Sequence, residues 1–183
     1  GDKLVVRCPI EARDFAIKCT KKAYELGAGE VVVDYRDQVI SRLKYENENI
    51  DVLTDIPKHK VDKENYYMEK KAKYLSVTGS DPDAFKGVDS DKLFQSNLAN
   101  SKALRDFSAK MMANYVSWIV VGASIPSWAT KVFPDLEEDE AVKRLWFEIF
   151  NSVRLFEDDP EKALENHVDN LNRYSKFLND TKF

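Results

Sequence analysis

Short apolar runs alternate along the chain with longer segments in which apolar residues recur every three or four positions. The run Leu4–Cys8 is rich in β-branched residues and predicts a strand. Residues 12–26 follow with helical spacing, and Gly27 and Gly29 come where that helix should end, since glycine tolerates the positive φ of a C-cap. Val31–Val33 then predicts a second strand. The first third of the chain is therefore predicted to be a β-α-β unit.

The next part of the chain has a weaker pattern. Gln38–Glu48 is plausible as a helix, whereas Asn49–Asn65 fits neither period and predicts a loop with one helical turn. We expect Tyr66–Lys73 to form a short charged helix and Tyr74–Val77 a third strand. The strand is followed by Gly79–Asp83, which has the composition of a tight turn.

The second half of the chain predicts one more strand and several helices. Ser90–Tyr115 has the length of one or two helices, and Trp118–Val121 predicts a fourth strand. The segment Pro126–Pro134 is too interrupted for a prediction. Two helices should follow, a strongly buried one from Glu137 and a last one from Pro160. The last helix has these residues on its apolar side: Leu164, His167, Val168, Leu171, Tyr174 and Leu178.

Strands that alternate with helices predict an α/β fold. We expect a mainly parallel sheet of about four or more strands, with helices on both faces and a C-terminal helical layer. With 183 residues, of which 43% are hydrophobic, the whole chain 1–183 should be a single domain. Because it lacks an initiating Met and begins close to the first strand, we expect it to be a piece of a longer protein, cut by design or by proteolysis.

Composition excludes several classes of partner. The net charge of -4 gives no broad attraction to nucleic acid or to anionic lipid. No apolar run is long enough to cross a bilayer, and the N-terminus does not resemble a signal peptide. The two cysteines, Cys8 and Cys19, are expected to be reduced and structural. These features predict a cytoplasmic protein without a nucleic-acid or membrane partner.

Searches for catalytic and cofactor motifs give no site. Asp34 at the end of the second strand would suit a dinucleotide, but the preceding strand-to-helix turn lacks the glycines that phosphate requires. No Walker-type phosphate loop is present in the sequence. His59 and His167 are the only histidines, and they suggest no spaced set of metal ligands. We therefore assign no catalytic, cofactor-binding or metal-binding residue to this chain.

Several polar and aromatic features have structural explanations that we favour. His167 is interpreted as a hydrogen-bonded structural imidazole and His59 as a surface loop residue. Two acidic groups, Glu137–Glu140 and Glu157–Asp159, should cap helix N-termini. The turn Gly79–Asp83 follows a strand, where it could touch a substrate or a second domain, although a turn alone is favoured. Four aromatic residues are assigned to core packing: Trp118, Trp128, Phe133 and Trp146.

Five motifs, taken in order, resemble the N-terminal half of the thermophilic metalloaminopeptidase family, which includes enzymes of the aminopeptidase T, aminopeptidase S and PepS type. They are Tyr74–Asp83, Lys86–Asp89, Pro126–Pro134, Glu140-Ala141 and Leu145-Trp146. The resemblance also includes Arg42–Asn47 and the helix that begins at Asp159-Pro160, so it extends over essentially the whole chain. Together these motifs are far more specific than any one of them.

This resemblance implies a parent about twice as long or somewhat longer, with its two-metal centre in the missing C-terminal half. Two divalent ions of the zinc, cobalt or magnesium type would serve there, so this chain would be an N-terminal non-catalytic domain. It would support or wall the site of a homodimeric aminopeptidase and restrict access of peptide substrates. Its expected partner is its own C-terminal catalytic domain.

Two other functions remain open from the residues. The chain could be a stand-alone α/β module that binds a peptide or small molecule near Asp34 and the turn 79–81, at the carboxyl ends of its strands. It could instead be a helical dimerisation domain that uses its terminal helices.

Overall fold

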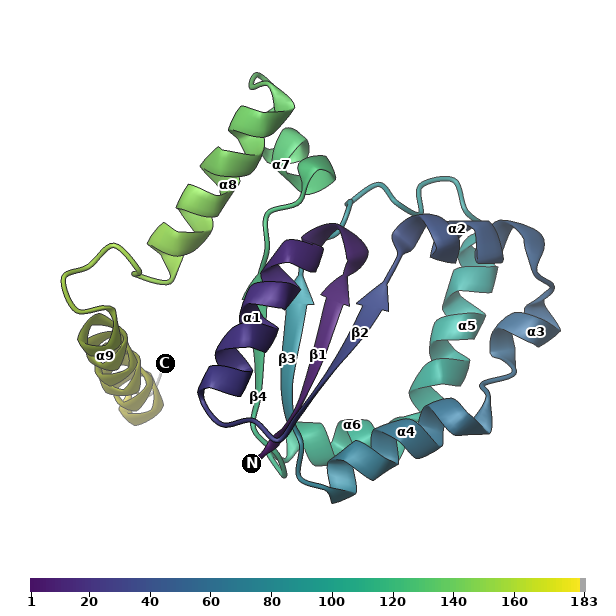
Figure 1. The fold of residues 1–183 in the computed structure, drawn as a ribbon, viewed down its shortest axis with the longest axis horizontal. Coiled ribbons are helices and arrows are strands. Elements are labelled where there is room, and N and C mark those ends of the chain that lie inside the picture. Colours follow the sequence, from purple (N-terminus) through teal and green to yellow (C-terminus); the bar gives the residue numbers. More distant parts are fainter. Residues whose placement is uncertain (182–183) are drawn as a thin grey trace.

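The structure is a computed structural model that describes residues 1–181, in which four strands and nine α-helices alternate (Figure 1). The first half contains β1 (Lys3–Pro9), a 3-10 turn η1 (Ile10–Ala12), α1 (Arg13–Glu25), β2 (Glu30–Arg36), α2 (Gln38–Asn47), α3 (Ile50–Thr54), α4 (Lys58–Glu69) and β3 (Lys73–Thr78). The second half contains α5 (Ser90–Ala103), α6 (Arg105–Met112), β4 (Trp118–Gly122), α7 (Pro126–Val132), α8 (Glu138–Ser152) and α9 (Pro160–Asp180).

All four strands are parallel and lie in the order β2-β1-β3-β4. Val5 is in register with Val32 on one side and with Tyr74 on the other, so β1 is central. The chain moves outward from β1 to β2 and then crosses β1 to reach β3. This reversal places helices on both faces of the sheet, which confirms the predicted α/β class.

One face of the sheet packs against α1 and the helices that follow β4. Val6, Cys8 and Val77 point into this layer and meet the small side chains of Ala12 and Ala16, which let α1 approach closely. Trp128 and Trp146 border the same cluster, and Phe133 packs between α7 and α8, as predicted. The fourth aromatic residue assigned to the core, Trp118, is instead exposed because it lies on the edge strand β4.

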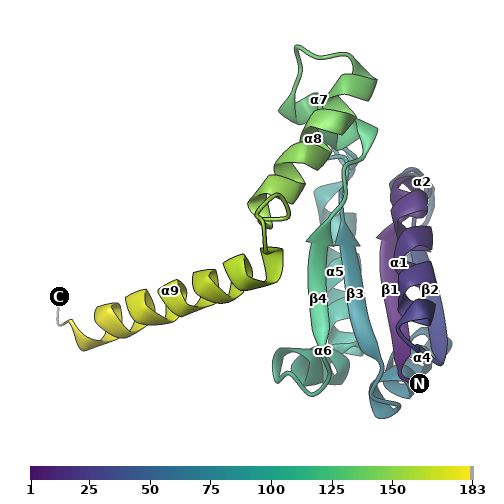
Figure 2. The same cartoon turned by 60° about the vertical axis from the view of Figure 1, so that its left-hand side comes forward.

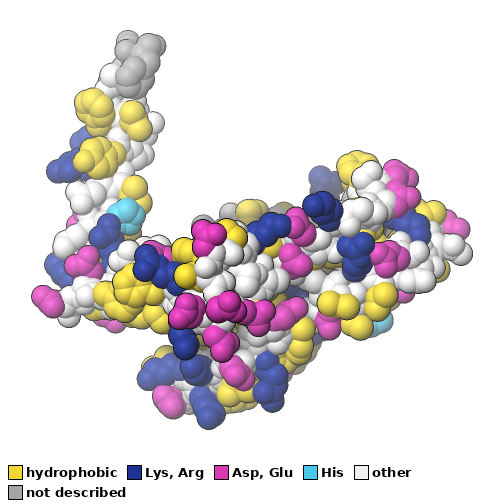
Figure 3. Space-filling view, turned by 90° about the horizontal axis from the view of Figure 1, so that it is seen from above, with side chains coloured by type: hydrophobic (Ala, Val, Ile, Leu, Met, Phe, Trp, Pro, Cys, Tyr) yellow, Lys and Arg dark blue, Asp and Glu magenta, His cyan; other side chains and the backbone are white. Residues whose placement is uncertain are grey.

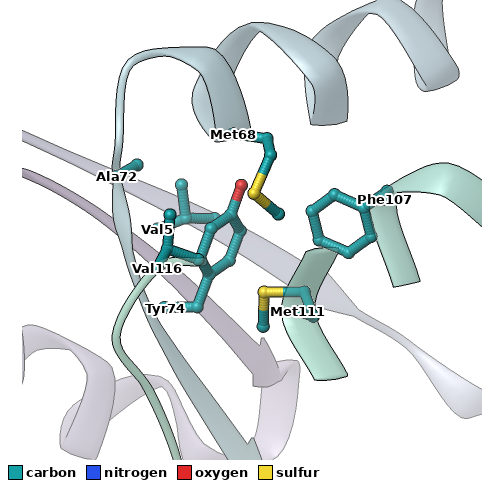
Figure 4. Packing of buried hydrophobic residues seen from close by; sticks show 7 residues of the cluster. All are labelled: Val5, Met68, Ala72, Tyr74, Phe107, Met111 and Val116. Atoms are coloured by element: carbon teal, nitrogen blue, oxygen red, sulfur yellow. The ribbon is translucent and has the colours of Figure 1, made fainter. Parts of the chain in front are cut away.

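The other face packs against α4 and α6 (Figure 4). The cluster consists of Val5, Met68, Ala72, Tyr74, Phe107, Met111 and Val116. At its border the Arg7 guanidinium lies 5.1 Å from the Tyr74 ring centroid and donates to Glu64 Oε2 at 2.6 Å. The Tyr74 hydroxyl finds no hydrogen-bond partner in residues 1–181, and its burial raises the pKa of Tyr74 to about 12.

The segment 49–65 differs from the sequence prediction, since the predicted loop is wrong. It contains α3 and most of α4, and the following helix ends at Glu69, so Lys73 belongs to β3 rather than to that helix. Each of the two helices buries a single side chain, Leu53 in α3 and Met68 in α4. So few core positions leave little periodicity for a pattern to reveal.

Two boundary features refine the sequence reading. Gly27 has φ +88° after α1, as a C-cap glycine should, whereas a positive φ is not found at Gly29. The uninterpreted segment 126–134 contains the helix α7, which begins at Pro126 and buries Ala129 against α8. Proline suits the first turn of a helix because its missing N–H would have no partner there.

The C-terminal helical layer is formed by α7 and α8, and α9 extends away from it (Figure 2). The expectation that α8 is strongly buried is wrong, because only Ala141 and Leu145 of this helix are buried. No residue of α9 is buried. The sequence pattern identified apolar faces on both helices correctly, but the described chain covers little of either face.

Candidate functional site

A cleft of about 420 Å³ lies at the carboxyl edge of the sheet, where all four strands end. Its walls come from the segments that follow each strand: Glu11 after β1, Gln38 after β2, Asp81 after β3 and Ser127 after β4. The other lining residues are Val39, Arg42, Asp83, Ala84 and Pro126. Open α/β sheets bind ligands at this edge, near the point where the strand order reverses. The cleft is therefore the candidate site.

Most of the polar groups around the cleft already have partners. Gln38 Oε1 accepts a hydrogen bond from the Asp81 backbone N–H at 2.8 Å, and Asp81 Oδ1 accepts one from the Asp83 N–H at 2.9 Å. Arg42 Nη1 donates to the carbonyl oxygens of Ala84 at 2.9 Å and Lys86 at 3.0 Å. These bonds fix the loop after β3, so the side chains shape the cleft more than they offer free reactive groups.

The one strongly paired carboxylate of the cleft is Asp83, which forms an ion pair with Lys131 of α7. The hydrogen bond and positive charge of Lys131 lower the pKa of Asp83, and the carboxylate in turn raises the pKa of Lys131. Both groups are then charged at neutral pH. This pair can join the β3 loop to α7, but an ionised, paired carboxylate is a poor general acid.

The turn 79–83 has the geometry of a constrained backbone. Gly79 has φ +145°, a value that side chains other than hydrogen rarely allow. A Cβ atom placed there would lie 2.3 Å from the carbonyl oxygen of Ala123. The interpretation of this segment as a turn agrees with its geometry. The structure brings Asp81 into the cleft but not Asp34, which forms an ion pair with Lys63.

The other side chains singled out from the sequence lie away from the cleft. His59 is exposed as predicted, although it lies in α4 and not in a loop. His167 is exposed on α9, and its Nδ1 atom lies 3.4 Å from Arg154 Nη2, a contact that agrees with the predicted hydrogen-bonded imidazole. Asp159 caps α9 by accepting from the Lys162 N–H at 3.0 Å, whereas Glu137 makes no side-chain cap to α8.

Both cysteines are free, and we expect them to differ in reactivity. Cys8 is fully buried, and desolvation raises the pKa of its thiol to about 11. Cys19 is only partly buried, although its pKa is also raised by burial. Since the thiolate is the reactive form, iodoacetamide at neutral pH should modify Cys19 slowly and leave Cys8 intact. Peptide mass mapping measures both sites, with the unfolded chain as control. Equal labelling of the two sites in the folded chain would contradict the burial of Cys8.

A sequence model of the thermophilic metalloprotease family (M29) matches residues 1–183, which is the entire chain. The chain belongs to the M29 family. Its M29 membership agrees with the motifs of residues 74–89 and 126–146, from which the resemblance was inferred.

Relatives of this M29 chain are named aminopeptidases. It is 36% identical to aminopeptidase PepS of Streptococcus thermophilus over 184 residues and 33% identical to aminopeptidase T of Thermus aquaticus over 191 residues. Both alignments cover 100% of this chain and 45% of the relative. The solved structure of wild-type AmpT from Thermus thermophilus matches with a TM-score of 0.77 and 33% identity, covering 82% of this chain and 38% of that one. The chain thus spans less than half the length of these relatives.

An M29 metalloprotease requires metal ions, and the donors within residues 1–181 do not fit a metal site. No group of three or more His, Cys, Asp or Glu residues that could hold an ion occurs within residues 1–181. Most zinc sites use three or four protein ligands. We therefore place no metal chemistry on the described residues. None of the helices in the described part of the chain is long and apolar enough to span a membrane.

Sequence reasoning missed the cleft residues Glu11, Gln38, Arg42 and Ser127. They are polar residues of unremarkable spacing that come together only because four parallel strands end at one edge. The available signal was their position, since each follows a predicted strand or lies in the next helix. The M29 motifs also include Arg42 and Ser127.

Proposed function

We propose that this chain is the N-terminal, non-catalytic domain of a cytoplasmic metal-dependent aminopeptidase that releases N-terminal residues from peptides. Three observations together support this proposal. The relatives are named aminopeptidases, the chain spans about 45% of their length, and its described residues do not fit a metal site. The remaining part of the parent would hold two divalent ions of the zinc, cobalt or magnesium type. The parent enzyme would act as a homodimer.

The exposed apolar side chains of β4 support the proposal that another domain packs on this strand. In a parallel sheet, strands are normally covered on both faces. Neighbouring residues on a strand point to opposite faces, yet Ile119 and Val120 of β4 are 57% and 51% exposed. In the described chain β4 also pairs with β3 alone. We propose that the catalytic part of the parent covers this strand. The N-terminal domain would then form one side of the active site and restrict the access of peptides to it.

A second candidate function is that of a stand-alone module that binds a peptide or small molecule. The cleft at the strand ends favours it, because its position is the general ligand site of open α/β sheets. We rank it second because the hydrogen bonds of Gln38, Asp81 and Arg42 are directed at the protein's own backbone. A saturable ligand of the isolated chain, measured by calorimetry, would favour this alternative.

The test compares the parent enzyme with the 183-residue chain on amino-acid amide and short peptide substrates. Each protein is assayed with zinc, cobalt or magnesium salts and again after chelation. We expect cleavage by the parent that chelation abolishes, and no cleavage by the short chain, because its described donors do not fit a metal site. Metal-dependent cleavage by the short chain would overturn the proposal, and so would an inactive parent.

A further inference from the structure

A second pocket lies between α2, α3, the start of α4 and α5, and we call it the helical pocket. It has a volume of about 630 Å³, which is in the range of small-molecule sites. Within residues 1–181 it shares no lining residue with the cleft at the carboxyl edge of the sheet. The helical pocket is therefore a separate candidate for binding a ligand.

The walls of the helical pocket are tied to one another by side-chain hydrogen bonds. Lys92 Nζ of α5 donates to the carbonyl oxygens of Tyr45 at 3.0 Å and Glu48 at 2.7 Å, which joins α5 to the end of α2. Lys60 Nζ of α4 donates to Asn100 Oδ1 of α5 at 2.8 Å. The helix α3 packs against α5 as well. The pocket is thus formed before a ligand arrives, so binding does not have to order its walls.

The lining of the helical pocket carries both signs of charge in equal number. Lys44 and Lys60 are its cations, and Glu48 and Asp55 are its carboxylates. Figure 3 shows basic and acidic side chains interspersed over the side of the molecule where α2 and α3 lie. A ligand with a single charge gains little from such a lining. A ligand with a cationic and an anionic end can be complementary to it at both ends.

Two of these charged groups lack a close partner of opposite charge. Lys60 forms no ion pair within residues 1–181, and its ammonium is held by the neutral amide of Asn100. Glu48 is partly buried, and its Oε1 atom lies 3.9 Å from Lys44 Nζ, which is beyond hydrogen-bond distance. Lys60 can therefore bind a carboxylate and Glu48 an ammonium group. The amide of Asn97, which also lines the pocket, offers a donor and an acceptor that suit a peptide group.

We propose that the helical pocket binds a dipeptide with two free ends. The ammonium group of the ligand would bind Glu48, and its carboxylate would bind Lys60. Val52 lines the pocket and is 59% exposed, so it can contact an apolar side chain of the dipeptide. The proposal does not rest on the proposed activity. It also differs from the second candidate function, whose ligand would lie in the cleft.

The test is calorimetric titration of the 183-residue chain with the dipeptide leucyl-alanine. A chelator is present, so that metal-dependent cleavage cannot contribute heat. We expect saturable binding of one dipeptide per chain. Acetylation of the amino end or amidation of the carboxyl end should each weaken binding about tenfold, because each removes a charged hydrogen bond.

Two variants assign the ends of the ligand to residues. Lys60→Gln should bind the free and the amidated dipeptide equally well, while it still prefers the free over the acetylated form. Glu48→Gln should show the opposite pattern. A general disturbance of the fold would weaken all three ligands together and could not produce this exchange of preferences. The matched control is Lys58→Gln, because this lysine of α4 is 86% exposed and lies outside the lining, so both preferences should remain.

Several results would overturn the proposal. They are the lack of saturable binding, equal binding of the free and blocked dipeptides by the wild-type chain, and variants at Lys60 and Glu48 that keep both preferences. Loss of binding in Glu11→Gln, with binding retained in the two pocket variants, would place the ligand in the cleft instead. Peptidase assays of the parent are independent of all these results.

Discussion

Replacing Gly79 with alanine is expected to be among the most damaging single substitutions in this domain. The residue has φ +145°, and the new Cβ would lie 2.3 Å from the Ala123 carbonyl oxygen. That carbonyl cannot easily retreat, since the Ala123 N–H donates to Thr78 O at 2.7 Å where β3 and β4 end. Backbone strain and the forced shift together should reduce the free energy of unfolding by about 3 kcal/mol or more. Urea unfolding followed by tryptophan fluorescence measures the loss.

The control substitution Gly87→Ala separates the effect of backbone strain from the effect of the steric clash expected for Gly79→Ala. Gly87 also has a positive φ, +81°, but nothing lies within 4 Å of its Cβ position. The backbone strain alone should reduce the free energy of unfolding by about 1 kcal/mol. If the two substitutions reduced the free energy of unfolding equally, the close approach of the two strand ends at Gly79 would not exist as described. The carboxyl-edge cleft would then be differently shaped.

The four strands could be predicted from sequence because buried parallel strands require short, nearly continuous apolar runs. Leu4–Cys8 and Val31–Val33 are of this kind, and both lie within strands of the structure. The helices α3 and α4 could not be predicted in the same way. Each buries one side chain, and their other support is local, such as the ion pair of 2.5 Å between Lys58 and Asp62. Packing of α4 against the sheet and of α3 against α5, which the local sequence does not encode, completes these helices.

The pattern of α9 shows a different limit. Its spacing correctly predicted one apolar side, yet that side is exposed in the described chain. Periodicity indicates that a helix has a partner, but it does not say whether the partner belongs to the same chain. Periodicity was equally silent about the edge strand β4, where Trp118 was assigned to a core that does not reach it.

The cleft could be predicted only as a location. The sequence favoured a turn alone for residues 79–83, with contact to a ligand or second domain as the alternative, and Asp81 does line the cleft. The motif of residues 126–134 has a structural role that could not be predicted from the sequence. Its first residues, Pro126 and Ser127, form a wall of the cleft, and Ala129 lets α7 pack closely on Ala141 of α8. This motif therefore positions structure at the site and provides no reactive group of its own.

Met68→Ala tests whether α4 is an integral part of the domain. Its side chain is 0% exposed and packs with Tyr74 and Phe107 beneath the helix (Figure 4). Truncation leaves a cavity in a well-packed cluster and should reduce the free energy of unfolding by about 3 kcal/mol, measured by urea unfolding.

Met112→Ala is the matched control for this substitution, because Met112 is 69% exposed at the end of α6. Its removal should change the free energy of unfolding by less than about 0.5 kcal/mol. A large difference between the two methionines would establish that α4 is docked on the sheet, as the structure describes. Equal and small losses would mean that the segment after α2 behaves as the loop that the sequence predicted. The face of the sheet around Tyr74 would then lack its cover.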